Sequence, residues 1–532
     1  MLSRRLLYGA AFVAGMTTLG IEMSITRLIG AILGTADIVW AAVITLVLVY
    51  LTLGYVLGGR WADRSPQPVT FFRLLAWTAL AAGLVPVVAR PLMLRMASAF
   101  ALANLDLAVL IVVGLSVAIL FAVPMILLGC VSPFVVRLAI SDTATAGRAA
   151  GQVYAVSTLG SLLGTFAPTL VLIPAIGTAW TFGLFALILL AAALLGLYRL
   201  SPRRALLHAW MPVLLLILLA AGIRGPVKPA PAGTTLLYEK ETAYNYVQVV
   251  EVNPGMIVSR QPAGTRLLML NEGQGVHSVY HPEHLQTGAT WDMFLAAPYF
   301  NDGVDPATID RIAIIGLAAG TIAQQYTAVY GPVAIDGIEI DPGIVEAGRR
   351  FFGMTMPNLN VIVGDGRYGL AHLPGGYDLI AIDAYRVPYI PWHLTTVEFF
   401  TEVREKLAPQ GVVMINVGRA ASDRRFVDAI AATMLQVYPT VQAIDVPYSF
   451  NTLLVGTQTP TTADNLIRNR QALPADAHPL LRDTLTLAAE SLAEVVPSTT
   501  IFTDERAPVE TMINTMILEF ILGADNLSQI QG

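Results

Sequence analysis

Apolar residues follow two different patterns along the chain. Before about residue 224 they form long uninterrupted runs, whereas after Gly233 they are mixed with polar residues as in an ordinary soluble domain. Seven of the runs reach roughly 20 residues, the length that an α-helix needs to cross the hydrocarbon core of a bilayer. The pattern therefore predicts a helical membrane domain over residues 1–224, with spans at Leu6–Leu33, Ile38–Gly58, Thr70–Val88, Leu105–Leu128, Gly151–Ile173, Ala179–Tyr198 and Leu206–Ile223.

The arginines between these predicted spans indicate the orientation of the chain in a cell membrane. Nine of them fall on the side of the amino terminus, and only Arg90 and Arg95 fall on the other side. By the positive-inside rule the amino terminus is cytoplasmic. Seven helices then place the second half of the chain outside the cytoplasm. One miscounted or re-entrant segment would reverse this, and the stretch in doubt is 129–142, so the side of the second half stays open.

Two charged residues, Glu22 and Arg27, lie inside the first predicted span. Charged side chains within a membrane are costly and need partners, so each is a candidate functional residue. The two are five positions apart on a helix and do not share a face. A structural bridge from each to another helix explains them equally well, and both interpretations remain open.

The second half begins with a Pro-rich linker at 225–233, which reads RGPVKPAPAG together with its preceding arginine. Alternating apolar residues then predict a small antiparallel β-region over 234–290. From residue 291 to 532 we expect an α/β domain of the Rossmann-like type. This expectation rests on four short apolar runs with helix-like segments between them. The runs are Ile312–Ile315, Val333–Ile338, Val361–Val363 and Leu379–Ile382. This alternation is typical of a doubly wound parallel sheet.

Composition narrows the function classes. Hydrophobic residues make up 55% of the 532 residues and charged residues only 13%, which is too apolar for a wholly soluble protein. The net charge of −5 and the lack of a basic patch argue against nucleic acid as a partner. A single cysteine, Cys130, excludes an internal disulfide. No ligand set for a metal is expected.

A small-residue turn and two acids follow the first two strands of the predicted sheet. Gly316 and Gly320 frame the turn after the first strand, where backbone amides at a helix start can approach a ligand closely. Glu339 and Asp341 follow the second strand, where a carboxylate can accept the hydroxyls of a ribose. Each acid by itself is commonly a helix cap or a turn residue.

Acids also follow the third and fourth strands. Asp365 stands where a side-chain acceptor can meet the amino group of an adenine, and Asp383 ends the fourth strand. Because the carboxyl ends of parallel strands lie at one edge of a sheet, acids at four successive strand ends gather there. The pattern predicts a site for an adenosyl ligand.

With these residues in view, the second half resembles the spermidine synthase (polyamine aminopropyltransferase) family, which has a class I methyltransferase-like fold. With predicted membrane helices in front, the whole chain resembles the membrane-fused spermidine synthase-like proteins of bacteria. The likeness extends to Glu22 and Arg27, and to GRAAGQVYAVSTLGSLLGT at 147–165, HLTTVEFF at 393–400 and FTDERAPVE at 502–510.

The resemblance implies a cofactor and roles for individual residues. The implied co-substrate is decarboxylated S-adenosylmethionine, or S-adenosylmethionine itself. Gln248 would contact the nucleoside, Glu339 would hold the ribose, and Asp365 with Gly366 would meet the adenine. Asp383 matches the catalytic aspartate, which orients an amine and takes its proton. Further expectations are a homodimer and an acceptor pocket shaped by Gln274, Tyr385, Arg386 and Tyr448.

The chain departs from the family pattern at several places, beginning with the turn after the first strand, which carries no acid and has Ala318 where glycine is usual. The family's Tyr-His-Glu triplet is replaced by Thr290, Trp291 and Asp292, and Arg386 stands where a second aspartate would grip a diamine. Two like charges about 4 Å apart repel by roughly 4 kcal/mol at an effective dielectric near 20. We therefore expect putrescine to be a poor acceptor unless Arg386 turns away or pairs with an acid. An acceptor with a carboxylate or phosphate is favoured.

Three functions remain open at this point. The first is a membrane-bound aminopropyltransferase with an amine acceptor, putrescine or an atypical one. The second is another S-adenosylmethionine-dependent transferase, such as a methyltransferase. The third is a transporter or sensor that binds a nucleoside-like ligand without turnover, which an extracytoplasmic second half would favour.

Overall fold

The computed structural model describes residues 4–33, 37–101, 106–140, 142–222, 225–271, 275–385, 389–420 and 423–522. The chain divides into two compact units. The first contains Met1–Pro229 together with Lys240–Tyr246, and the second contains Ala230–Glu239 together with Val247–Gly532. The chain passes between the units at residues 229–230, 239–240 and 246–247. The linker at 225–233 and the other domain boundaries stay predictions.

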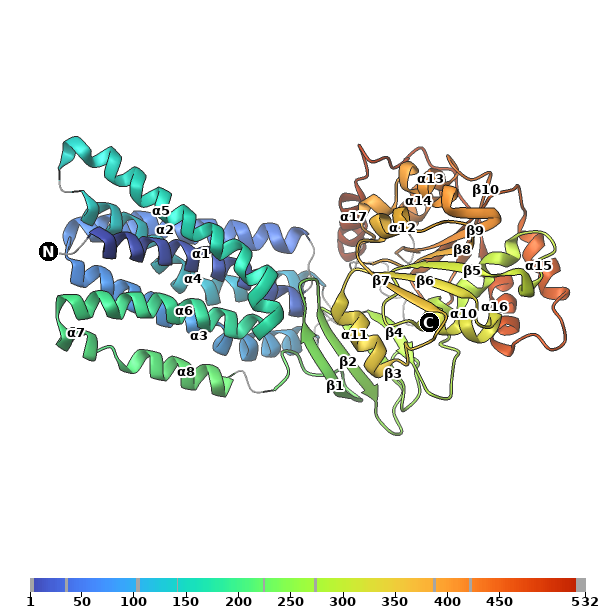
Figure 1. Cartoon of the computed structure of the whole chain (residues 1–532), viewed down its shortest axis with the longest axis horizontal. Coiled ribbons are helices and arrows are strands. Elements are labelled where there is room, and N and C mark those ends of the chain that lie inside the picture. The colour runs from blue at the N-terminus through green and yellow to red at the C-terminus, as the bar shows by residue number, and fades with distance from the viewer. Residues whose placement is uncertain are drawn as a thin grey trace. The chain divides into compact units, whose positions relative to one another are not determined.

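The first unit is a bundle of long apolar helices (Figure 1). The helix α1 packs mainly against α5, α2 against α4, and α3 against α6. Their bounds are α1 (Arg4–Leu33), α2 (Asp37–Arg64), α3 (Pro68–Ala101), α4 (Asp106–Ala139), α5 (Ala146–Ala167), α6 (Ile173–Leu200), α7 (Pro202–Leu206) and α8 (Trp210–Gly222), with the short turns η1 (Thr143–Thr145) and η2 (Pro168–Leu172) beside α5.

Within the described residues, six helical stretches are long and apolar enough to cross a membrane. One of them, Ala146–Leu200, is 55 residues long and is interrupted at Gly177, whose backbone is non-helical with φ +79°. That break lies between the predicted spans Gly151–Ile173 and Ala179–Tyr198, so this one stretch contains both of them. Large apolar side chains such as Leu53, Val56 and Leu162 are exposed. The unit is compatible with a multi-pass membrane protein.

Several predicted helix ends are wrong. The span predicted to end at Leu128 continues as α4 to Ala139, through Pro124 and Pro133, so the doubtful stretch 129–142 is largely helix. The span Thr70–Val88 is the first part of the longer α3, and the helix of the last span, α8, begins at Trp210 and not at Leu206. Hydropathy detects the segment that would lie in lipid and carries no signal for a helix that continues beyond it.

Close helix packing in this unit depends on glycine. A Cβ atom at Gly160 would lie 2.0 Å from the Phe12 carbonyl oxygen, and one at Gly164 would lie 2.1 Å from that of Met16. Glycine therefore lets α5 approach the backbone of α1, as small residues do in membrane helix pairs. Of the two charged residues in the first predicted span, Arg27 donates through Nη1 to the Tyr244 carbonyl at 3.2 Å within the same unit, and the functional role of Glu22 stays a prediction.

The second unit contains two sheets. The smaller has the order β1-β2-β3-β4, with β2 antiparallel to β3 and β3 to β4, as predicted for the leading β-region. Its strands are β1 (Thr234–Glu241), β2 (Tyr246–Val252), β3 (Arg266–Leu270) and β4 (Val276–Tyr280). The larger sheet has the order β12-β10-β11-β9-β8-β5-β6-β7. The predicted fold class, apolar helices followed by a Rossmann-like α/β domain, is confirmed.

The parallel part of the larger sheet contains the four predicted strands. These are β5 (Arg311–Ile315), β6 (Ala334–Glu339), β7 (Leu359–Val363) and β8 (Tyr377–Ile382), with β9 (Leu407–Gly418) parallel to β8. The antiparallel strands β10 (Thr440–Asp445), β11 (Asn451–Thr457) and β12 (Leu492–Ala493) extend one edge. Residues 312–315 are fully buried, as expected for a strand that is covered on both faces.

The order of these strands determines where a ligand can bind. From β5 the chain proceeds to β6 and β7 on one side and then returns to β8 and β9 on the other. Ligands of open α/β sheets bind outside the carboxyl ends of the strands where this reversal occurs. The surrounding helices are α9 (Thr290–Met293), α10 (Thr321–Tyr330), α11 (Pro342–Phe351), α12 (Gly366–His372), α13 (Val397–Lys406), α14 (Arg425–Met434), α15 (Ala463–Gln471), α16 (Pro479–Glu490) and α17 (Val509–Leu522), with the 3₁₀ turns η3 (Phe294–Phe300), η4 (Pro306–Thr308) and η5 (Trp392–Leu394) (Figure 1).

Candidate functional site

The turn between β5 and α10 brings the strand ends of the site together. Gly316, Ala318 and Gly320 all have positive φ, at +87°, +49° and +92°. A Cβ atom at Gly316 would lie 2.4 Å from the Asp383 carbonyl oxygen, so glycine there lets the end of β8 lie against the turn. The amides of residues 316 and 317 both donate to the Ile338 carbonyl. The turn therefore joins the ends of β5, β6 and β8.

Glu339, at the end of β6, is held by backbone amides. Its Oε2 accepts from Ala318 N at 2.9 Å, and its Oε1 accepts from Asp341 N at 3.0 Å. Burial raises the pKa of Glu339 to about 7, against the opposing effect of these donors. Each oxygen keeps a lone pair that a hydroxyl could use. Because the Ala318 amide already has this partner, the predicted approach of a ligand to the turn stays a prediction.

Asp341 caps a helix, which is a role separate from the ligand contact predicted for it. It is the N-cap of α11, and its Oδ1 accepts from Gly343 N at 2.8 Å. Its side chain is fully buried. Between the two acids, Ile340 leaves an apolar surface 39% exposed at the strand end. Contact between Asp341 and a ligand remains a prediction.

Asp365 is the N-cap of α12, which begins at Gly366. Its Oδ1 accepts from the backbone N–H groups of Arg367 and Tyr368, and its Oδ2 lies 2.9 Å from His393 Nε2. Burial by itself would raise the pKa of Asp365, but the hydrogen bonds from Tyr368 N and His393 outweigh it and hold the pKa below its usual value. Asp365 is therefore an ionised hydrogen-bond acceptor at neutral pH.

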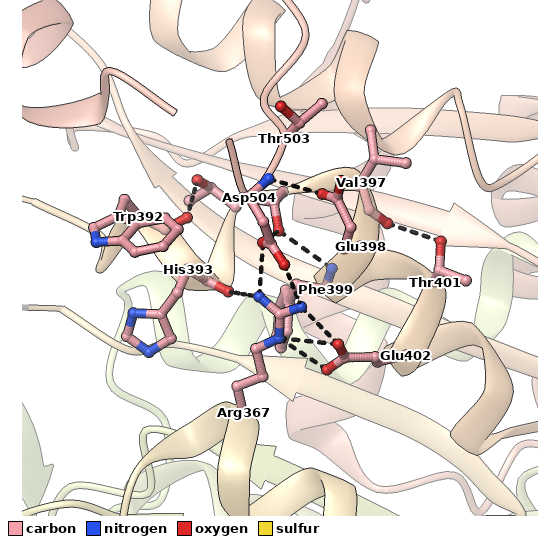
Figure 2. Close-up of polar contacts among 12 residues, drawn as sticks. Arg367, Trp392, His393, Val397, Glu398, Phe399, Thr401, Glu402, Thr503 and Asp504 are labelled. Carbon is pink, nitrogen blue, oxygen red and sulfur yellow. Dashed lines mark hydrogen bonds and ion pairs between the residues drawn. The ribbon is translucent and has the colours of Figure 1, made fainter. Parts of the chain in front are cut away.

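Acids and backbone groups gather around Arg367, two residues after Asp365 in the chain (Figure 2). Arg367 donates through two nitrogens to Glu402 of α13, through Nη1 and Nη2 to Asp504, and through Nη1 to the His393 carbonyl. Asp504 also accepts from Thr396 Oγ1, and its own N–H donates to Glu398. Bidentate contacts of this kind fix both distance and direction. They connect α12, η5 and the FTDERAPVE segment.

Asp383 follows β8 and has a different environment. Its Oδ1 accepts from Asn416 Nδ2 at 2.9 Å, and the Trp291 indole also donates a hydrogen bond to its carboxylate. Burial raises the pKa of Asp383 to about 6, and these two neutral donors only partly offset that shift. A carboxylate of this kind can exchange a proton near neutral pH.

The other residues predicted for the site are not all close to Asp383. The hydroxyl of Tyr385 donates to the Asn416 carbonyl at 3.0 Å, so Tyr385 lies beside the Asp383 region. Gln248 is buried in β2. Tyr448 is 89% exposed in the turn between β10 and β11, and the Arg260 guanidinium lies 4.1 Å from its ring centre. Gln274 and Arg386 lie outside the described residues.

Sequence reasoning missed three side chains of this region: Trp291, Asn416 and His393. Trp291 was noted only as part of a replaced triplet, although it contacts Asp383. Asn416 is the one polar side chain in the apolar stretch GVVMINVG. A polar residue within a predicted buried strand was the signal that could have identified it. His393 lies in a motif that the resemblance names without a role. None of the three has a spacing that predicts its partner.

Comparison with known proteins finds relatives that include named polyamine aminopropyltransferases. The chain is 32% identical over 298 residues to a protein of Bifidobacterium longum named probable polyamine aminopropyl transferase, covering 52% of this chain and 62% of that one. It is 32% identical over 176 residues to the polyamine aminopropyltransferase of Vibrio vulnificus, covering 32% of this chain and 56% of that one. The aligned part thus spans about three fifths of these relatives' own length.

A solved structure is also similar. The crystal structure of a probable spermidine synthase from Corynebacterium glutamicum matches with a TM-score of 0.38 and 23% identity, covering 52% of this chain and 99% of that one. No protein-family model matches the chain. Part of the chain is thus similar in sequence to proteins named polyamine aminopropyltransferases.

Proposed function

We propose that the chain is a membrane-bound aminopropyltransferase, which transfers an aminopropyl group from decarboxylated S-adenosylmethionine to an amine. The observation that carries this proposal is the environment of Asp383: a carboxylate at the carboxyl end of a central strand, held by neutral donors, with its pKa raised to about 6. Similarity in sequence to named polyamine aminopropyltransferases supports the same reaction class.

The adenosyl end of the donor fits the strand ends of β6 and β7. Glu339 has lone pairs for the ribose hydroxyls, and the exposed Ile340 offers an apolar surface to a base. Asp365 provides an ionised acceptor for an adenine amino group. These are the groups that an adenosyl ligand needs at this edge of a parallel sheet.

Asp383 supplies the proton chemistry. An amine must lose its proton before its lone pair can attack the methylene carbon beside the sulfonium. Asp383 orients the amine and accepts that proton. The carbon–sulfur bond then breaks, its electron pair passes to sulfur, and methylthioadenosine leaves as a neutral thioether. Loss of charge at sulfur favours transfer in a site with little water.

The test is release of methylthioadenosine. Purified full-length protein in detergent or nanodiscs is given decarboxylated S-adenosylmethionine and a panel of amines that includes putrescine, monoamines and amines with a carboxylate. We expect methylthioadenosine with at least one amine. Release with none of them would exclude aminopropyl transfer.

Two further arms separate the alternatives. Binding heats for S-adenosylmethionine and its decarboxylated form are compared, and preference for the carboxylated form would favour another transferase such as a methyltransferase. Protease accessibility in intact cells tests the membrane side. Digestion of the second unit from outside would favour a binding function without turnover, whereas protection would favour the enzyme. The homodimer stays a prediction.

A further inference from the structure

Asn416 uses only half of its side-chain amide. Its Nδ2 donates to Asp383 Oδ1 at 2.9 Å, whereas its Oδ1 has no hydrogen-bond partner among the described residues and is shielded from solvent. The residue is 6% exposed. A buried acceptor without a donor is costly, and such groups are rare enough in native proteins that each needs an explanation.

The direction of this amide follows from its neighbours. An ionised Asp383 can only accept hydrogen bonds, so the amide must turn its N–H₂ group toward the carboxylate. The backbone of Asn416 is fixed by Tyr385, whose hydroxyl donates to its carbonyl. The Trp291 indole donates to Asp383 and the Tyr385 hydroxyl to the Asn416 carbonyl. Among the residues that the structure describes, no donor is therefore left for Asn416 Oδ1.

We propose that Asn416 is a specificity-determining residue for the acceptor, whose amine donates one N–H to Asn416 Oδ1 while it gives a proton to Asp383. This inference rests on the proposed function. The bond lengths of an amide and the contact to Asp383 put the two acceptor oxygens at most about 5 Å apart. One nitrogen can therefore donate to both, since each hydrogen bond spans about 2.9 Å.

The geometry selects a class of acceptor. A primary ammonium group has three N–H bonds: the proton of one passes to Asp383 and leaves the lone pair that attacks the methylene carbon, the second is held by Asn416, and the third is not used. The product is a secondary ammonium, and the pair from the broken carbon–sulfur bond remains on sulfur. An N,N-dimethylated ammonium has a single N–H, whose proton passes to Asp383, so no N–H is left for Asn416. The site thus favours primary over N,N-dimethylated amines.

The test compares kcat/KM for a primary amine and for its N,N-dimethyl derivative, measured as methylthioadenosine release by the full chain. Asn416→Leu removes the amide at nearly constant volume. Asn416→Asp keeps an acceptor oxygen at the same position and also serves if the leucine variant does not fold. Trp291→Phe is the matched control, because it removes a donor to Asp383 and no acceptor.

We expect the preference for the primary amine to fall on the order of ten-fold in Asn416→Leu, since one hydrogen bond to a charged or partly charged donor is lost. The preference should persist in Asn416→Asp and in Trp291→Phe. An unchanged preference in Asn416→Leu, or an equal fall in all three variants, would overturn the inference. Failure of the wild-type chain to release methylthioadenosine with any amine would instead refute the proposed function, and the inference with it.

Discussion

Asp365 and Asp383 lie at the same edge of one sheet and have opposite environments. Asp365 accepts from two backbone amides and from His393, and these hydrogen bonds lower its pKa. The contacts around Arg367 lie beside it. Asp383 accepts from an amide and an indole, both neutral, and burial raises its pKa to about 6. The comparison teaches that the surroundings set the chemistry of each carboxylate: Asp365 remains ionised as a hydrogen-bond acceptor, and Asp383 can exchange a proton.

The largest expected effect comes from removing the proton acceptor. Asp383→Asn keeps the shape of the side chain but cannot take a proton, so kcat should fall by roughly 10²- to 10⁴-fold. Calorimetric affinity for the adenosyl co-substrate should stay within a few-fold of wild type. Methylthioadenosine release at saturating substrate measures the first quantity. Activity within ten-fold of wild type would remove Asp383 from the chemistry.

Changes near Asp365 should affect the stability of the protein and its affinity for the adenosyl co-substrate, and not the proton transfer. Arg367→Met leaves Glu402 and Asp504 without their shared partner, and we expect a loss of about 2–3 kcal/mol in the free energy of unfolding. Affinity for the adenosyl co-substrate should also fall, since Arg367 fixes the His393 carbonyl. Denaturant unfolding and calorimetry check both.

A matched control for Arg367 is Arg468→Met. Arg468 pairs with Asp302 at 3.3 Å, and both side chains are mostly exposed, so the loss should be about 0.5 kcal/mol or less. Equal losses for the two variants would show that the cluster around Arg367 contributes no more than an ordinary surface pair.

Binding of the adenosyl co-substrate should depend on pH through Glu339. Its folded-state pKa is raised from 4.5 to about 7, so its effect on stability is fully favourable only below the unfolded value and is lost as pH rises through about 7. Hydroxyl donors favour the ionised form. The association constant should therefore fall as pH drops below about 7, and Glu339→Gln should flatten that dependence. A wild-type constant that is flat from pH 8 to 5.5 would contradict this role.

A smaller effect is expected at Trp291. Trp291→Phe removes one donor that favours the ionised form of Asp383, so the pKa of Asp383 should rise further above its ordinary value. The acid limb of the rate profile should then move to higher pH, with only a few-fold loss at pH 8. Trp392→Phe, at an exposed ring outside these contacts, serves as the control. A limb that does not move would show that the Trp291 contact has no influence on the proton acceptor.

The sequence predicted the scaffold better than the contacts of the site. Four apolar runs became β5 to β8, because buried parallel strands leave an apolar signal that acids and glycines interrupt at the ends. The acids at those ends were likewise visible. Helix ends such as Ala139 of α4 were not, since the helix continues beyond the segment that hydropathy detects.

Contacts between distant residues had no sequence signal. Asn416 lies 33 residues from Asp383 and reaches it only because β8 and β9 pair in parallel. Trp291 reaches the same carboxylate from α9, far earlier in the chain. From the sequence, Asp341 could be either a ligand contact or a helix cap, and the structure shows the helix cap. Such pairings depend on strand order and register, which local patterns do not encode.

The most direct test of the different roles of the two carboxylates is the pH dependence of kcat for methylthioadenosine release, with both substrates saturating. The account predicts a rate that falls below about pH 6 as Asp383 becomes protonated, and a residual rate in Asp383→Asn that lacks this limb. A wild-type rate that stays constant down to pH 5, or a limb that persists unchanged in Asp383→Asn, would contradict it.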